Sequence, residues 1–168
     1  MRRTFEGATP TVAADASVSD LAYLVGDVTV GERASLWPFV SLRGDSGPVT
    51  VGAESNVQEF ATLHGATIGE GVSVGHGATV DFATVESNGI VGIGSCVLPD
   101  ATVESDCIVA ANAVVTSGQT VPAGHGAFGA PAEVRPLTDD QREQIRKTRE
   151  HYVELGGRFV ESGPHDRP

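Results

Sequence analysis

Two histidines and a nearby aspartate have the side chains with which proteins bind zinc and related metals. His64 and His76 offer imidazole nitrogens, and Asp81 offers carboxylate oxygens. Two histidines and one carboxylate form a known zinc ligand set that leaves a position open for water or substrate, so these residues point to metal-assisted chemistry. The alternative is that Asp81 pairs with Arg43 and that the two histidines bind metal weakly or not at all. Both interpretations depend on the fold that positions these side chains.

A period of six residues dominates the chain and predicts that fold. Aliphatic residues recur at every sixth position in successive runs: Val12, Val18, Leu24, Val30, Leu36 and Leu42; Val51, Val57 and Leu63; Ile68, Val74 and Val80; then Val85, Val91, Val97, Val103, Val109, Val115 and Val121. Such a period fits neither an α-helix nor a simple hairpin, but it suits a triangular coil with one hexad per side. A β-sandwich would not hold this phase over so many hexads. We therefore expect an all-β solenoid, a parallel β-helix with hexapeptide repeats, over residues 1–137.

Counting hexads predicts which residues of successive coils lie above one another. Arg43, His64 and Asp81 each follow an aliphatic residue one coil apart, so they should form one column. Glu59 and His76 should form a second column on another edge or face. Within one chain His76 should then point away from His64, so a metal bound by both would lie between subunits. A closed cyclic trimer would supply three such contacts.

The C-terminal segment has the pattern of a helix. Thr138 and Gln141 have the spacing of a capping box, and Gly156-Gly157 is a typical stop signal. We expect a helix over residues 138–156, within a segment 138–160 that packs on the β-helix. Residues 161–168 should form a polar, mobile tail.

Composition excludes several classes of partner. The chain of 168 residues carries a net charge of −11 and a single lysine, Lys147, which argues against nucleic acid and anionic membranes as partners. Its first residues lack the apolar stretch of an export signal, so we expect a cytoplasmic protein.

The remaining cysteines and histidines are given no chemical role. The spacing of Cys96 and Cys107 matches no redox or zinc motif, so we interpret them as buried thiols. His125, His151 and His165 are interpreted as structural or surface residues.

Several short motifs together resemble the γ-class carbonic anhydrases. They are Leu36-Trp37-Pro38, Leu42-Arg43-Gly44-Asp45, Asn56-Val57-Gln58-Glu59, His64, Gly75-His76-Gly77-Ala78 and Gly129-Ala130-Pro131-Ala132. The resemblance implies a left-handed β-helix and a homotrimer with one zinc, iron or cobalt ion at each subunit interface. The first two metal-binding histidines of the family correspond to His64 and His76. The third is replaced here by Asp81, which we expect to ligate through oxygen.

The resemblance also implies roles for four neighbouring residues. Gln58 would donate a hydrogen bond that orients the attacking hydroxide, and Glu59 would accept a proton or simply be an exposed acid. Arg43 and Asp45 would form a charged pair at the interface between subunits.

The sequence leaves three functions open. The first is metal-dependent interconversion of carbon dioxide and bicarbonate by a carbonate dehydratase-like lyase. The second is acyl-CoA transfer or thioester hydrolysis, which other hexapeptide-repeat proteins perform, with a histidine such as His76 as the base. The third is a noncatalytic trimer that retains only the scaffold.

Overall fold

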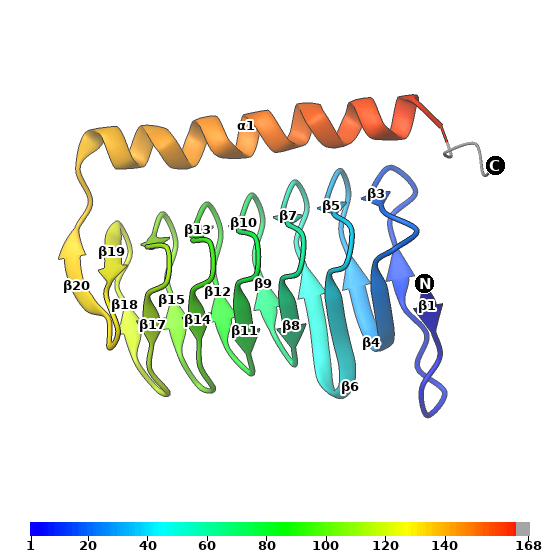
Figure 1. The fold of residues 1–168 in the computed structure, drawn as a ribbon, viewed down its shortest axis with the longest axis horizontal. Coiled ribbons are helices and arrows are strands. Elements are labelled where there is room, and N and C mark those ends of the chain that lie inside the picture. Colours follow the sequence, from blue (N-terminus) through cyan, green and yellow to red (C-terminus); the bar gives the residue numbers. More distant parts are fainter. Residues whose placement is uncertain (164–168) are drawn as a thin grey trace.

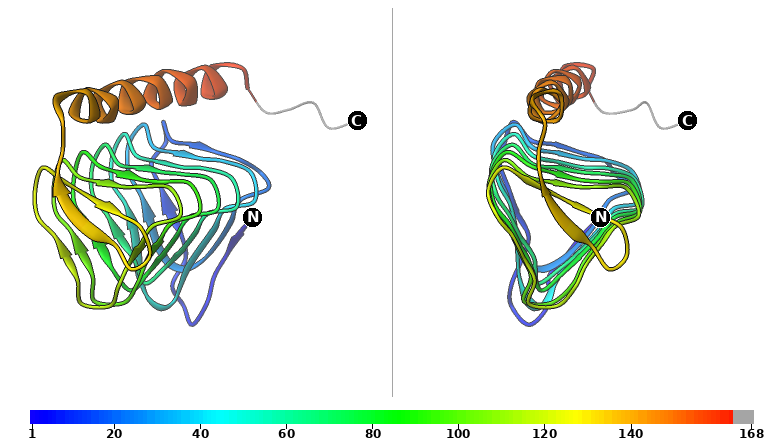
Figure 2. Two further views of the ribbon diagram at one scale, coloured as in Figure 1. Left: turned by 60° about the vertical axis from the view of Figure 1, so that its left-hand side comes forward. Right: turned by 90° about the vertical axis from the view of Figure 1, so that its left-hand side faces the viewer.

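The computed structural model describes residues 1–163, and it is a triangular prism of stacked parallel coils with one helix along its outside (Figures 1 and 2). The strands are β1 Arg2–Arg3, β2 Thr11–Val12, β3 Ser17–Val18, β4 Tyr23–Val30, β5 Ser35–Leu36, β6 Ser41–Val51, β7 Asn56–Val57, β8 Thr62–His64, β9 Thr67–Ile68, β10 Ser73–Val74, β11 Thr79–Asp81, β12 Thr84–Val85, β13 Ile90–Val91, β14 Cys96–Val97, β15 Thr102–Val103, β16 Ile108–Val109, β17 Val114–Val115, β18 Thr120–Val121, β19 His125–Phe128 and β20 Glu133–Pro136. The helix α1 spans Asp139–Glu161. Within residues 1–163, no helix has the length and apolar character needed to span a membrane.

The three sides of the prism come from two hydrogen-bonded sheets. The long strands β4 and β6 belong to two sides at once, and they join the ladders β8-β11-β14-β17 and β9-β12-β15-β18 into a single sheet. The third side is the ladder that runs from β3 to β20. Neighbouring strands pair in parallel throughout both sheets, except that β19 and β20 pair antiparallel at one end of the prism. The predicted β-solenoid is therefore confirmed.

The core is the column of aliphatic residues that the six-residue period predicts. Leu42 pairs with Leu63, and Leu63 pairs with Val80, in parallel register. All three side chains are fully buried. Burial of apolar surface stabilises a fold by roughly 25 cal/mol per Å², so a shift of any coil by one residue would expose this column and cost several kcal/mol. The register, which also positions the polar columns, is fixed by this core.

Helix α1 begins where the sequence predicts and ends later. Thr138 and Gln141 form the expected capping box. The expected stop at Gly156-Gly157 is wrong, because the helix continues to Glu161. Gly156 is buried, and a Cβ atom there would lie 3.2 Å from the Cβ of Ser35. This glycine therefore allows the helix to approach β5 closely, rather than ending it. Of the predicted tail, residues 164–168, including His165, lie outside the described part of the chain.

An arginine of the helix ties α1 to three successive coils. Arg149 donates hydrogen bonds to Glu54 at 2.5 and 2.8 Å, to Glu70 at 2.6 Å and to Asn88 at 2.5 Å. Its side chain is largely covered, which makes such charge-assisted bonds stronger than they are in open solvent. The planar guanidinium thus sets the position of the helix along the prism.

The two cysteines differ in burial. Cys107 is buried, and its thiol donates to the carbonyl of Pro122 at 3.0 Å. Burial raises the pKa of this thiol, so it stays protonated and unreactive. Cys96, also expected to be buried, is only partly covered, because it precedes the core residue Val97 and its side chain faces outward.

Candidate metal centre

The first polar column contains Arg43, His64 and Asp81, one from each of three successive coils. Strand β8 pairs with β6 and β11 so that His64 is aligned with Arg43 on one side and with Asp81 on the other. The Nδ1 atom of His64 lies 2.9 Å from Oδ1 of Asp81, which is hydrogen-bond distance. The sequence predicted this column, because each of its residues directly follows a core residue and the core residues of successive coils must lie above one another.

Arg43 pairs with Asp45 and not with Asp81. Its Nη2 donates to Oδ2 of Asp45 at 3.0 Å, and this bond holds the pKa of the Asp45 carboxyl below its usual range. The alternative pairing of Asp81 with Arg43 is therefore absent within the chain. The other oxygen, Oδ1 of Asp45, lies 3.7 Å from Nε2 of His64. Among the described residues, neither of these two buried atoms has a hydrogen-bond partner.

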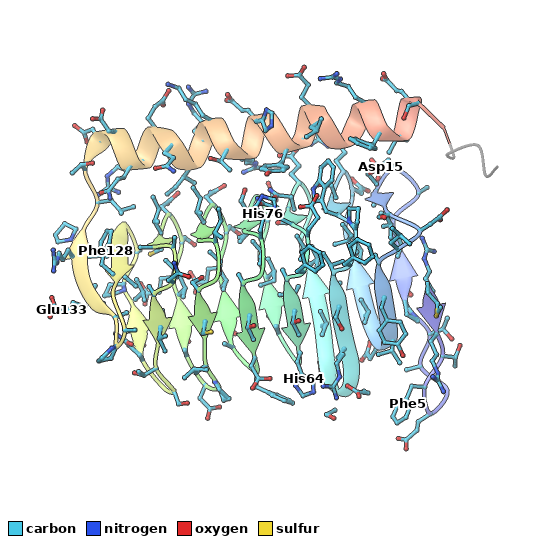
Figure 3. The ribbon with its side chains drawn as sticks, in the orientation of Figure 1. Phe5, Asp15, His64, His76, Phe128 and Glu133 are labelled. Carbon is cyan, nitrogen blue, oxygen red and sulfur yellow. The ribbon has the colours of Figure 1, made fainter. Side chains whose placement is uncertain are left out.

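The second polar column pairs His76 with Glu59. These residues follow β10 and β7, which pair in parallel, and Nδ1 of His76 lies 2.8 Å from Oε2 of Glu59. Figure 3 shows His64 and His76 on separate sides of the prism. Over residues 1–163, no group of three or more histidine, cysteine or acidic residues could hold a metal ion within one chain. A metal bound by both histidines would thus have to lie between two subunits.

A buried hydrogen-bond chain positions Gln58. Its Nε2 donates to Oδ1 of Asn56 at 3.0 Å, and Nδ2 of Asn56 donates to Oγ of Ser73 at 2.7 Å. All three side chains are buried. Asn56 and Ser73 are not among the site residues that the sequence predicts. The available signal was that both polar residues precede a core valine, at the same place in consecutive coils.

Helix α1 adds aromatic residues next to the second column. The ring of Trp37 packs edge-on against Tyr152 at 6.0 Å and against Phe159 at 5.1 Å between centroids. Burial, and secondly the negative charge of Glu59, raise the pKa of Tyr152. A groove of about 490 Å³ lies at this place, and its lining includes Trp37, Glu59 and Phe159. Glu59 therefore connects His76 to a partly apolar groove.

The chain is similar in sequence to carbonic anhydrases and in structure to a hexapeptide transferase family protein. No protein-family model matches the chain. A carbonic anhydrase of Geobacillus kaustophilus is 35% identical over 158 residues, which cover 90% of this chain and 87% of that protein. The mitochondrial gamma carbonic anhydrase 2 of Arabidopsis thaliana is 34% identical, with 87% of this chain covered, and the chain spans 57% of its length. A solved hexapeptide transferase family protein of Anaplasma phagocytophilum has a TM-score of 0.90 at 32% identity, covering 92% of this chain and 95% of that one.

The fold and these relatives define the class. The likeness in structure confirms the expected left-handed β-helix of the hexapeptide-repeat type. Within that class, the chain belongs to the γ-class carbonic anhydrase family. The relatives also support the expectation of a carbonate dehydratase-like lyase.

Proposed function

We propose that this protein is a metal-dependent carbonic anhydrase that interconverts carbon dioxide and bicarbonate as a homotrimer. His64 of one subunit and His76 of the next would hold a zinc, iron or cobalt ion at each interface. The observation that carries the proposal is the arrangement of both histidines. In each, Nδ1 lies within 3 Å of a carboxylate in the same column, and such carboxylates orient metal-binding imidazoles.

The side chains present fit such a metal. The buried Nε2 of His64, which has no partner among the described residues, is a ready imidazole ligand. Asp81 and Asp45 both lie beside His64, so a carboxylate oxygen is available to complete the ligand set. When bound, a divalent metal supplies a positive charge that acidifies water and stabilises negative oxygen.

Other residues of the chain supply orientation and proton handling. Gln58, held by the bond to Asn56, would orient the attacking oxygen, because its amide cannot rotate freely while that bond persists. Glu59 would accept a proton, and its contact with Nδ1 would orient His76. The charged pair of Arg43 and Asp45 would contribute to the contact between subunits.

Exposed aromatic residues support assembly into a trimer. Phe39 and Phe60 stack on each other at 5.2 Å between centroids, although their exposed fractions are 53% and 66%. Phe60 directly follows Glu59 in the chain, so this apolar surface adjoins the second column. Exposed apolar patches of this kind often mark protein contacts. Closure around a threefold axis would cover three such patches and form three metal sites.

Mixing two inactive variants tests this proposal. We expect the zinc-loaded protein to hydrate carbon dioxide, and His64→Ala and His76→Ala each to lose at least 100-fold in kcat/KM, because each removes a metal ligand. Trimers reassembled from both variants should recover part of the activity, since one interface can combine an intact His64 with an intact His76. A metal-loaded trimer without activity at alkaline pH, or no recovery on mixing, would contradict the proposal.

A second candidate function is acyl transfer or hydrolysis of an acyl thioester. It is favoured by the His76–Glu59 pair at 2.8 Å, which resembles a general base held by a carboxylate, and by the adjoining groove. The similarity to a hexapeptide transferase family protein agrees with it. Thioester hydrolysis that survives a chelator and His64→Ala, but not His76→Ala, would support this function.

The third candidate is a noncatalytic scaffold. It predicts that the purified trimer contains no stoichiometric metal.

A further inference from the structure

His64 lies between two carboxylates that approach different atoms of its ring. Oδ1 of Asp81 is 2.9 Å from Nδ1, and Oδ1 of Asp45 is 3.7 Å from Nε2. The side chains of His64, Asp45 and Asp81 are respectively 20%, 23% and 34% exposed, so solvent has limited access to this row of atoms. Each carboxylate can therefore have a distinct role.

The contact with Asp81 determines which nitrogen of His64 is available. A carboxylate that accepts a hydrogen bond from Nδ1–H fixes the neutral tautomer and leaves the lone pair on Nε2. The two ring nitrogens point in different directions, so a cation on Nε2 is remote from the oxygen bound to Nδ1. The contact of Asp81 with Nδ1 therefore places this carboxylate to orient the imidazole.

Unlike Asp81, Asp45 approaches the other ring nitrogen of His64 and makes no hydrogen bond to it. Arg43 occupies Oδ2 of Asp45, which leaves Oδ1 facing Nε2 of His64. Two buried lone pairs that face each other without a donor are unfavourable, and a cation between them would remove the cost. With zinc bonds of about 2.0–2.2 Å, two tetrahedral ligand atoms lie roughly 3.4 Å apart. The observed 3.7 Å is close to that separation.

We infer that Asp45 supplies the carboxylate ligand of the metal site and that Asp81 is a positioning residue for His64. This inference rests on the proposed metal site and replaces Asp81 in its expected role as a ligand. The complete set is then Nε2 of His64 and Oδ1 of Asp45 from one subunit, with an imidazole nitrogen of His76 from the next. Glu59 holds His76 in the same way that Asp81 holds His64. A fourth position stays open for water or substrate.

Two isosteric variants separate the roles of the aspartates. In Asp45→Asn, we expect the trimer to lose at least 100-fold in zinc affinity and its bound cobalt to change its visible absorption spectrum, because a ligand is lost. In Asp81→Asn, we expect zinc affinity to fall about 10- to 100-fold with an unchanged cobalt spectrum. Nitrogen NMR of the metal-free trimer should show the Nδ1–H tautomer of His64 in the wild type. The fraction of this tautomer should fall only in Asp81→Asn, because a neutral amide oxygen accepts a weaker hydrogen bond than a carboxylate. Asp100→Asn removes the same charge at an exposed corner and should change none of these readouts.

Each contrary result has a defined meaning. If Asp81→Asn changes the cobalt spectrum while Asp45→Asn keeps full zinc affinity, Asp81 is the ligand and the inference is wrong. If Asp45→Asn does not assemble, Asp81→Asn alone still decides, because a changed cobalt spectrum in it overturns the assignment. A wild-type trimer that binds no metal would overturn both the inference and the proposed function. A trimer that shows the expected ligand pattern without hydrating carbon dioxide would contradict only the proposed function.

Discussion

At the scale of single residues, Tyr152 offers a titration that reports on the surroundings of the second column. Burial, followed by the charge of Glu59, raises its pKa. We expect absorbance titration to show one tyrosine ionising above the usual value of about 10, and Tyr152→Phe to remove this transition. Because folding raises this pKa, the associated stability is present below about pH 10 and is lost as the pH rises through the raised pKa.

Glu59→Gln tests how much the negative charge of Glu59 contributes to the raised pKa of Tyr152. It preserves the shape of the side chain and removes its charge, so the pKa of Tyr152 should fall part of the way toward the ordinary value. An unchanged Tyr152 titration in Glu59→Gln would show that burial alone accounts for the shift.

The sequence predicted which residues share a column but not which atoms pair. Register follows from counting hexads, because one slipped residue would expose the whole core. The choice of partner by Arg43 depends on side-chain direction. Arg43 and Asp45 lie two apart on β6 and face the same side, which brings the guanidinium to Asp45 and leaves Asp81 to His64. Such choices depend on rotamers that residue spacing does not encode.

At the scale of elements, α1 shows why one terminus was predictable and the other was not. The capping box is a local interaction between Thr138 and Gln141, so the sequence alone reveals it. A glycine pair has two meanings: it can end a helix in a left-handed turn, or it can let a helix approach another element. The backbone of Gly156 is not left-handed, and its contact with Ser35 is a tertiary feature that local sequence cannot specify.

The adjacent glycines of α1 should respond oppositely to substitution. A Cβ at Gly157 meets no atom within 4 Å, so Gly157→Ala should raise the free energy of unfolding by roughly 0.5–1 kcal/mol through helix propensity. Gly156→Leu must fit a large side chain where a Cβ already lies 3.2 Å from Ser35, and should lower it by about 1–3 kcal/mol. Urea unfolding at fixed protein concentration measures both. Equal effects at the two positions would contradict the close packing of Gly156.

At the scale of the whole molecule, the net charge of −11 is distributed over a triangular prism. Mutual repulsion among these charges weakens the compact state. Salt screens this repulsion, because the Debye length falls to about 3 Å at 1 M.

The left-handed corners of the coils provide matched positions for a test of this repulsion. Asp100 and Asn112 both occupy exposed corners with φ of 63° and 57°. Aspartate and asparagine both tolerate this conformation, so exchanging them changes charge with little change in backbone strain.

We therefore expect opposite effects from the two exchanges. At about 20 mM salt, Asp100→Asn should raise the urea midpoint of unfolding and Asn112→Asp should lower it, each by the equivalent of a few tenths of a kcal/mol, as expected for exposed charges. At 1 M sodium chloride both differences should shrink toward zero, because screening removes the long-range part of the repulsion. Differences that persist at high salt would mean that local contacts at these corners, and not the charge of the whole molecule, determine the response.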